Sequence, residues 1–103
     1  VFDVKIIVLG CGNIGLVTAR DFAESLPFSE VVIADLDINR AREAGSRINL
    51  ENIGWIQVNA SNYSELVSTL KKFDLVVGAL PGTLGYQACR ASIKANVDMV
   101  DVS

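Results

Sequence analysis

Three glycines and one aspartate in the first part of the chain have the types and the spacing of a ligand-binding site. The glycines are Gly10, Gly12 and Gly15 in the stretch IIVLGCGNIG, and Asp35 follows Gly15 by 20 residues. In the order G-x-G-x-x-G the first glycine permits a tight turn, the second lets the backbone approach a pyrophosphate, and the third lets a helix pack closely. An acidic side chain about 20 residues further on accepts hydrogen bonds from the ribose hydroxyls of the adenosine half. The pattern therefore predicts a dinucleotide-binding site.

The residues around these glycines separate two classes of nucleotide-binding protein. Asn13 and Ile14 are expected to begin a helix, whose free N–H groups and positive end attract a phosphate. Methyltransferases that bind S-adenosylmethionine have a similar loop, but its order resembles G-x-G-x-G, with an acidic residue two positions before the first glycine. Here that position is Val8, and Ile14 moves the last glycine one place further. The spacing favours a dinucleotide over S-adenosylmethionine.

The composition limits the other chemistry that the chain can support. It has 103 residues, a net charge of −3, two cysteines and no histidine. A negative net charge argues against nucleic acid or an anionic membrane as the partner, because both attract a basic surface. With no histidine, and with Cys11 and Cys89 far apart, the sequence offers neither a zinc site nor the commonest general base. We expect a bound cofactor to supply the chemistry and expect no metal site. We also expect a reducing, cytoplasmic location.

Alternating apolar runs and helical patterns predict an α/β fold. The runs are too continuous for half-exposed strands and are typical of a parallel sheet buried on both faces. The expected strands are Val4–Leu9, Glu30–Asp35, Trp55–Val58, Phe73–Leu80 and Asp98–Val102. Four helical patterns lie between them: Pro27 ends the first, Asp37 and Asn62 cap the second and third, and Pro81 or Gly82 opens the fourth.

Strict alternation of strands and helices determines the expected topology. Short right-handed crossovers give a doubly wound, Rossmann-type parallel sheet with three layers and the strand order 3-2-1-4-5. Residues 1–103 form one domain in this interpretation, and we expect it to be the first domain of a longer enzyme. The ligand is expected at the carboxyl ends of the first and fourth strands, where the strand order reverses. The expected buried stripe of the first helix is Ile14, Val17, Thr18, Phe22 and Leu26.

Four segments extend the interpretation from a fold to a family. They are VLGCGNIG, VVIADLDINRA, VNASNYSELVSTLKKFDLVVGALPG and ACRASIKANVDMVDVS. Together they resemble the N-terminal domain of the saccharopine dehydrogenase-like oxidoreductases, a group with saccharopine reductases, lysine dehydrogenases and carboxynorspermidine dehydrogenases. The cofactor contacts that this resemblance implies are Gly10, Gly12, Asn13, Ile14 and Gly15 at the pyrophosphate, Asp35 and Leu36 at the adenosine ribose, Asn59 and Ala60 by the adenine, and Ala79, Leu80 and Pro81 on the path toward the nicotinamide.

The resemblance implies an NAD(P)-dependent oxidoreductase that acts on an amino-acid C–N bond by hydride transfer. The residues that bind the amino-acid substrate and the catalytic residues are expected beyond Ser103, so this chain alone is expected to be inactive. The sequence leaves open whether the protein forms a homodimer. The alternative is a regulatory nucleotide-sensing module of the kind that gates potassium uptake. Such modules usually carry a G-D pair after the third strand, where this chain has Asn59 and Ala60, and they lack the segment ALPG. Asn59 also departs from many members of the resembled family, which have aspartate there, and a role in a turn is equally open for it.

Asp35 also bears on which dinucleotide is bound. The 2′-phosphate of NADP removes one hydroxyl donor and places a second negative group beside the carboxylate. Arg40 and Arg42 carry the opposite charge, but we expect both further along the second helix, beyond its first turn. The sequence therefore predicts that NAD is preferred and that NADP is the weaker cofactor.

Overall fold

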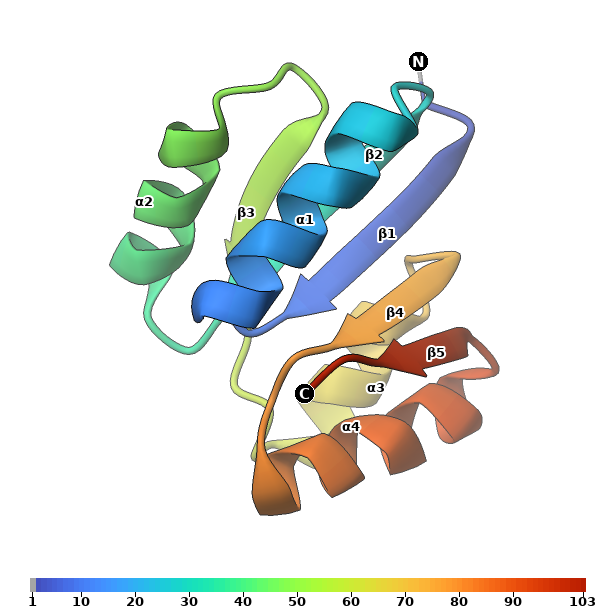
Figure 1. Ribbon diagram of the computed structural model, residues 1–103. Helices are drawn as coiled ribbons and strands as arrows, with labels where there is room; N and C mark the ends of the chain where they lie inside the picture. The colour runs from blue at the N-terminus through green and yellow to red at the C-terminus, as the bar shows by residue number, and fades with distance from the viewer. Residues whose placement is uncertain (1) are drawn as a thin grey trace.

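The computed structural model describes residues 2–103 and has five strands that alternate with four helices (Figure 1). The elements are β1 (Val4–Leu9), α1 (Asn13–Ser25), β2 (Ser29–Asp35), α2 (Ile38–Ile48), β3 (Ile53–Gln57), α3 (Tyr63–Leu70), β4 (Leu75–Gly78), α4 (Gly82–Ala95) and β5 (Asp98–Asp101). Each expected strand is present, with ends that differ by a few residues. Within residues 2–103 no helix combines the length and the apolar character that crossing a bilayer requires.

The sheet confirms the predicted fold class and strand order. Its order is β3-β2-β1-β4-β5, and every neighbouring pair is parallel. β1 lies at the centre, where Ile6 pairs with Val31 of β2 on one side and with Leu75 of β4 on the other. The chain therefore winds outward from β1 in both directions, and the strand order reverses between β1 and β4. Parallel strands place all their carboxyl ends at one edge, where the loops that precede α1 and α4 meet.

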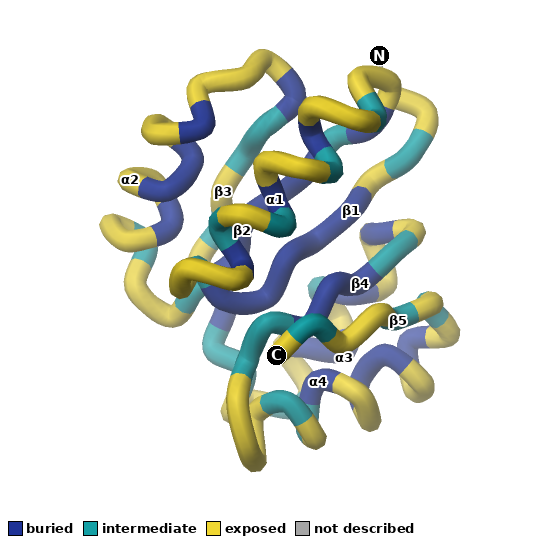
Figure 2. The backbone as a smooth tube through the Cα atoms, viewed as in Figure 1, coloured by how far each residue is buried: buried dark blue, intermediate teal, exposed yellow. Residues whose placement is uncertain are grey.

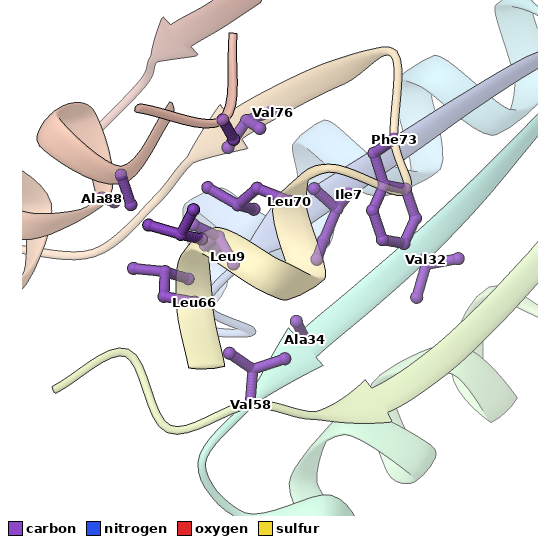
Figure 3. Packing of buried hydrophobic residues seen from close by; sticks show 13 residues of the cluster. Ile7, Leu9, Val32, Ala34, Val58, Leu66, Leu70, Phe73, Val76 and Ala88 are labelled. Atoms are coloured by element: carbon purple, nitrogen blue, oxygen red, sulfur yellow. The ribbon is translucent and has the colours of Figure 1, made fainter. Parts of the chain in front are cut away.

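The continuous apolar run of β1 serves two hydrophobic cores at once. Ile7 and Leu9 belong to the core beneath α3 and α4, whereas Ile6 and Val8 belong to the core beneath α1 and α2. Successive side chains of a strand point to opposite faces, so the part of β1 that is covered on both faces, residues 6–9, has no position for a polar residue. Figure 3 shows the first of these cores, in which Ile7 and Leu9 lie among side chains from α3, β2 and β4.

The buried face of α1 differs from the predicted stripe. Gly15, Ala19 and Ala23 are the buried residues, whereas Ile14 and Val17 are 54% and 55% exposed. In Figure 2 the outward turns of α1 are exposed along its length. The helix lies close to the sheet, and only small side chains fit between the two backbones, so the prediction was wrong for Ile14 and Val17 because it ranked residues by hydropathy and not by size.

Two predicted helix caps are confirmed. Asp37 precedes α2 and its side chain accepts a hydrogen bond from the backbone N–H of Asn39 at 2.9 Å. Asn62 precedes α3 and accepts in the same way from the N–H of Glu65 at 3.2 Å. These bonds satisfy N–H groups that have no partner inside the helix. Neither α1 nor α4, both within the described residues, has such a side-chain cap.

Candidate dinucleotide-binding site

Gly10 forms the turn that leaves β1, and its backbone requires glycine. Its φ is +101°, a conformation that residues with a Cβ rarely adopt. Its N–H donates to the carbonyl of Ala34 at 2.8 Å, so the turn is held against the end of β2. A Cβ at this position would lie 2.9 Å from the carbonyl oxygen of Ala79, which follows β4. Gly10 thus lets the loops after β1 and β4 approach each other at the point where the strand order reverses.

Gly12 caps α1 and faces open space. Its φ of −69° and ψ of −172° are accessible to any residue, and a Cβ built there would have no heavy atom within 4 Å. The folded chain within residues 2–103 therefore gives no steric reason for glycine at this position. A ligand whose phosphate approaches the backbone gives one, as the sequence motif predicts.

Gly15 lies in the first turn of α1 and packs against the glycine loop itself. A Cβ here would collide with the carbonyl oxygen of Gly10 and would lie 3.4 Å from the Cβ of Ala79. The prediction that Gly15 allows the helix to pack closely is confirmed. The atoms that lie against Gly15 are those of the loop backbone at Gly10. Through this contact the first N–H groups of α1 are set directly beside the turn at Gly10.

The loop after β4 repeats this arrangement, which the sequence analysis missed. Gly85 lies in the first turn of α4, and a Cβ there would lie 2.6 Å from the carbonyl oxygen of Leu80. Gly82 begins the helix with a φ of +57°. The signal was present in the sequence, because Gly82 and Gly85 have the same spacing as Gly12 and Gly15. Two helices without a side-chain cap therefore begin at the carboxyl edge of the sheet, on opposite faces, each fixed by a glycine against its own loop.

Asp35 ends β2 and its carboxylate is held in place. Its side chain is only 11% exposed, and Oδ2 accepts a hydrogen bond from the backbone N–H of Asp37 at 3.0 Å. The thiol of Cys11, next to Gly10, lies near the same carboxylate. Burial, together with the interaction with Asp35 and its negative charge, raises the pKa of Cys11 from 9.0 to about 11. Cys11 is therefore neutral at physiological pH and not a nucleophile.

A cavity of about 210 Å³ opens at the carboxyl edge of the sheet, beside Asp35. Its lining residues are Leu9, Gly10, Ala34, Asp35, Leu36, Arg40, Val58, Ala60, Leu80 and Leu84. The structure thus brings together five of the residues that the resemblance implied: Gly10, Asp35, Leu36, Ala60 and Leu80. Val58 and Leu84 were not expected, although both are apolar and suit the faces of an adenine ring.

The other expected residues lie on the loops around this cavity. Gly12 and Gly15 flank the start of α1, where Ile14 is exposed, and Ala79 and Pro81 flank Leu80 in the loop before α4. Asn13 lines a neighbouring cavity between α1 and α2.

The side chain of Asn59 forms a turn. Its Oδ1 accepts from the backbone N–H of Ser61 at 3.1 Å and from the hydroxyl of Ser61 at 2.6 Å. This is the turn role that the sequence left open for it, and its contact with adenine stays a prediction.

The position of Arg40 differs from the expectation. It lies in the first turn of α2, and its Nη1 is 4.0 Å from Oδ2 of Asp35. Arg42 is exposed and lines neither of the two cavities, as expected for a solvated helix face. The sequence analysis placed Arg40 too far from Asp35, although the cap that it predicted at Asp37 already puts Arg40 in the first turn of α2.

A parallel sheet with a glycine loop at its switch point, an uncapped helix behind that loop and an acid at the end of the second strand define a dinucleotide-binding Rossmann domain. The model of one family, described as "Saccharopine dehydrogenase NADP binding domain", matches residues 6–103. The chain belongs to this family, as the sequence resemblance predicted. The family description names NADP, so the preference for NAD stays a prediction.

Solved structures show the same fold at low sequence identity. The saccharopine dehydrogenase (L-Glu forming) of Saccharomyces cerevisiae is 19% identical over 97% of this chain, with a TM-score of 0.82. A wide-type short-chain dehydrogenase/reductase of Veillonella parvula in complex with NADP is 17% identical over 96%, with a TM-score of 0.70. A Rossmann-fold NAD(P)-binding protein of Shigella flexneri is 15% identical over 92%, with a TM-score of 0.66. The chain spans 22%, 46% and 49% of these three proteins.

Proposed function

We propose that this chain is the cofactor-binding domain of an NAD(P)-dependent oxidoreductase that acts on the C–N bond of an amino acid. Membership of the saccharopine dehydrogenase NADP-binding family supports the cofactor and the reaction class. Gly12 carries the proposal, because its missing Cβ leaves space at the start of a helix without a side-chain cap, and no contact within residues 2–103 explains a glycine there. A pyrophosphate fits this cradle, because backbone N–H groups at a helix N-terminus bind anions without any lysine.

The residues of this chain bind and orient the dinucleotide, and the bound nicotinamide supplies the hydride chemistry. Free N–H groups at the start of α1 bind the pyrophosphate, and Asp35 accepts from the ribose hydroxyls. Leu36 is assigned to the adenosine ribose, and Val58 and Ala60, which line the same cavity, to the adenine. The loop of Leu80, which contacts the position of Gly10, directs the other half of the cofactor across the switch point.

The proposal includes a preference for NAD over NADP. The carboxylate of Asp35 accepts a hydrogen bond from the N–H of Asp37, so it is oriented before the ribose arrives. A hydrogen bond to such a charged acceptor is worth about 1.5–3 kcal/mol, or roughly 10- to 150-fold in affinity. Titration of NAD and NADP against the unmutated chain and Asp35→Ser, at one salt concentration, tests this. We expect Asp35→Ser to weaken NAD binding and so to reduce the difference in affinity between NAD and NADP. If the ratio of the two affinities is the same in Asp35→Ser as in the unmutated chain, Asp35 only forms the turn.

We expect the chain to bind the cofactor without turning over a substrate. It contains no histidine and spans 22% of the yeast saccharopine dehydrogenase, so the groups that hold the amino acid and move its proton are proposed to lie outside it. Calorimetry with NAD and NADP measures binding, and absorbance at the NADH or NADPH band with lysine or saccharopine measures turnover. Sustained reduction of either cofactor by this chain alone would contradict the assignment of catalysis to other residues.

A further inference from the structure

Another cavity lies at the amino edge of the sheet, where the strands begin, opposite to the candidate dinucleotide site. This amino-edge cavity has a volume of about 400 Å³ and lies between the end of α1, the loop that joins α2 to β3, and the residues before β1. Figure 1 shows these three segments together at the end of the sheet away from the arrowheads. No residue proposed to contact the dinucleotide lines this cavity, so its chemistry is separate from the proposed function.

Asn52 lines the amino-edge cavity although only 7% of the residue is exposed. Its Nδ2 donates to the carbonyl of Ala23 at 3.0 Å and to that of Leu26 at 3.4 Å, so the end of α1 fixes the orientation of the amide. Oδ1 therefore points away from α1, and no donor among residues 2–103 bonds to it. Since no fully buried side-chain oxygen of these residues lacks a partner, Oδ1 is open to the cavity.

The charged side chains that line the amino-edge cavity are both negative. They are Glu24 of α1 and Glu51 of the loop before β3; both are exposed, and neither forms an ion pair with another of residues 2–103. The carboxyl end of α1 adds the negative end of a helix dipole, and no basic residue lies in the last turn of this helix. Together with Oδ1 of Asn52, these groups form a set of acceptors that suits a positively charged donor.

The other walls of the amino-edge cavity are apolar. Phe2 and Leu50 are 39% and 36% exposed, and Pro27 follows the end of α1. Methylene groups of a long cationic side chain pack against such surfaces, and an ammonium group over an aromatic ring gains a cation–π attraction. A metal ion suits the cavity less well, because residues 2–103 contain no group of three His, Cys, Asp or Glu side chains that could hold one.

We propose that the amino-edge cavity binds an alkylammonium group, carried either by a free alkylamine or by a lysine side chain of a partner. The ammonium group donates to Oδ1 of Asn52 and to the carboxylates of Glu24 and Glu51, and it has one N–H for each of these three acceptor groups. The alkyl stem lies against Phe2 and Leu50. Because the cavity lies at the opposite edge of the sheet from Asp35, we expect its occupation to leave dinucleotide binding unchanged.

Titrations followed by NMR on the isotope-labelled chain test this proposal. One probe is n-pentylammonium, a free amine, and the other is the capped peptide acetyl-Ala-Lys-Ala-amide, which presents a lysine side chain. The uncharged n-pentanol has the same stem as the first probe and serves as its control. We expect n-pentylammonium to shift the side-chain NH₂ signals of Asn52 saturably at about millimolar concentrations, and we expect n-pentanol to bind at least about threefold more weakly.

A pair of double variants measures the contribution of the two carboxylates. Glu24→Gln with Glu51→Gln removes both charges from the cavity and keeps the shapes of the side chains. Asp21→Asn with Glu65→Gln is the matched control, because it removes two exposed charges at positions that do not line the cavity. We expect the first variant to weaken n-pentylammonium by about 3- to 30-fold and the control to weaken it by less than about twofold. Thermal unfolding checks that both variants keep the fold.

Three results would overturn the proposal. The first is the absence of a saturable shift at Asn52 with both cationic probes. The second is equal affinity for n-pentanol and n-pentylammonium, because the cavity would then select only an apolar stem. The third is equal weakening in the two double variants, because the net charge of the chain would then account for binding. If the proposal holds, binding of the peptide indicates a lysine side chain of a partner, and binding of n-pentylammonium alone indicates a free amine.

Discussion

Replacing Gly12 or Gly15 with alanine separates ligand contact from folding within a single loop. The two positions lie three residues apart, but an added methyl group meets opposite surroundings. At Gly12 it enters open space, and at Gly15 it collides with the carbonyl oxygen of Gly10. We therefore expect Gly12→Ala mainly to weaken dinucleotide binding. We expect Gly15→Ala mainly to lower the free energy of unfolding.

The magnitudes follow from these surroundings. Gly12 has a φ of −69°, so alanine adopts its conformation and lowers the entropy of the unfolded chain, a gain of about 0.4–1 kcal/mol. Alanine is also a poorer N-cap than glycine by a similar amount, so the free energy of unfolding should change by less than about 1 kcal/mol. At Gly15 the helix or the loop has to move, and overpacking of this kind costs about 1–3 kcal/mol.

The affinity for the dinucleotide should fall more in Gly12→Ala than in Gly15→Ala. A methyl group at Gly12 holds the pyrophosphate away from the N–H groups of α1, and losing one charged hydrogen bond there costs about 1.5–3 kcal/mol, or roughly 10- to 150-fold in affinity. Urea unfolding measures stability, and calorimetry with NAD and NADP measures affinity. Unchanged binding by a stable Gly12→Ala variant would refute the assignment of this space to a phosphate.

Four further predictions concern the fold around the site. Asn62→Ala removes the only side-chain cap of α3 and should lower the free energy of unfolding by about 1 kcal/mol, seen as a lower urea midpoint with an unchanged slope. Leu66→Ala empties a fully buried position and should cost about 2–5 kcal/mol in the same assay. Gly85→Ala should destabilise as Gly15→Ala does, because its methyl group would meet the carbonyl of Leu80; a stability equal to that of the unmutated chain would contradict this contact. The unfolded thiol of Cys11 ionises near pH 9.0 and the folded one near pH 11, so the unfolded state loses its proton first and stability should fall as pH rises through this window; Cys11→Ser should reduce that fall.

The topology was predictable because it depends on patterns that lie along the chain. Residues 6–9 of β1 are apolar without interruption, which already indicates burial on both faces. The spacing of the glycines from Gly10 to Gly15, together with Asp35 after the second strand, predicted a binding site at the carboxyl edge of the sheet. The cavity beside Asp35 lies at this edge. The caps at Asp37 and Asn62 are local signals, because each side chain bonds to an N–H only two or three residues further on.

The remaining features depend on distances between elements, which hydropathy does not encode. Ile14 and Val17 were expected inside because they are apolar, but the gap between α1 and the sheet admits only small side chains. The start of α2 was predicted from the cap at Asp37, but the distance between the side chains of Arg40 and Asp35 depends on how α2 lies against β2. Gly85 was overlooked although its spacing from Gly82 repeats that of Gly12 and Gly15; its contact with the backbone of Leu80 became visible only in the folded chain.

The glycine contacts of the two loops have a consequence for how freely the sequence can change. Gly15 against Gly10, and Gly85 against Leu80, are close approaches to main-chain carbonyls, and the donors proposed for the pyrophosphate are also main-chain groups. Every amino acid except proline supplies the same backbone N–H and C=O groups, so most substitutions at neighbouring positions leave these atoms in place. Divergence over evolutionary time is then restricted at a few glycines and permitted almost everywhere else around the cleft. A designer who wished to transplant this cleft to another parallel sheet would need to copy the turns and the glycines, and few other side chains.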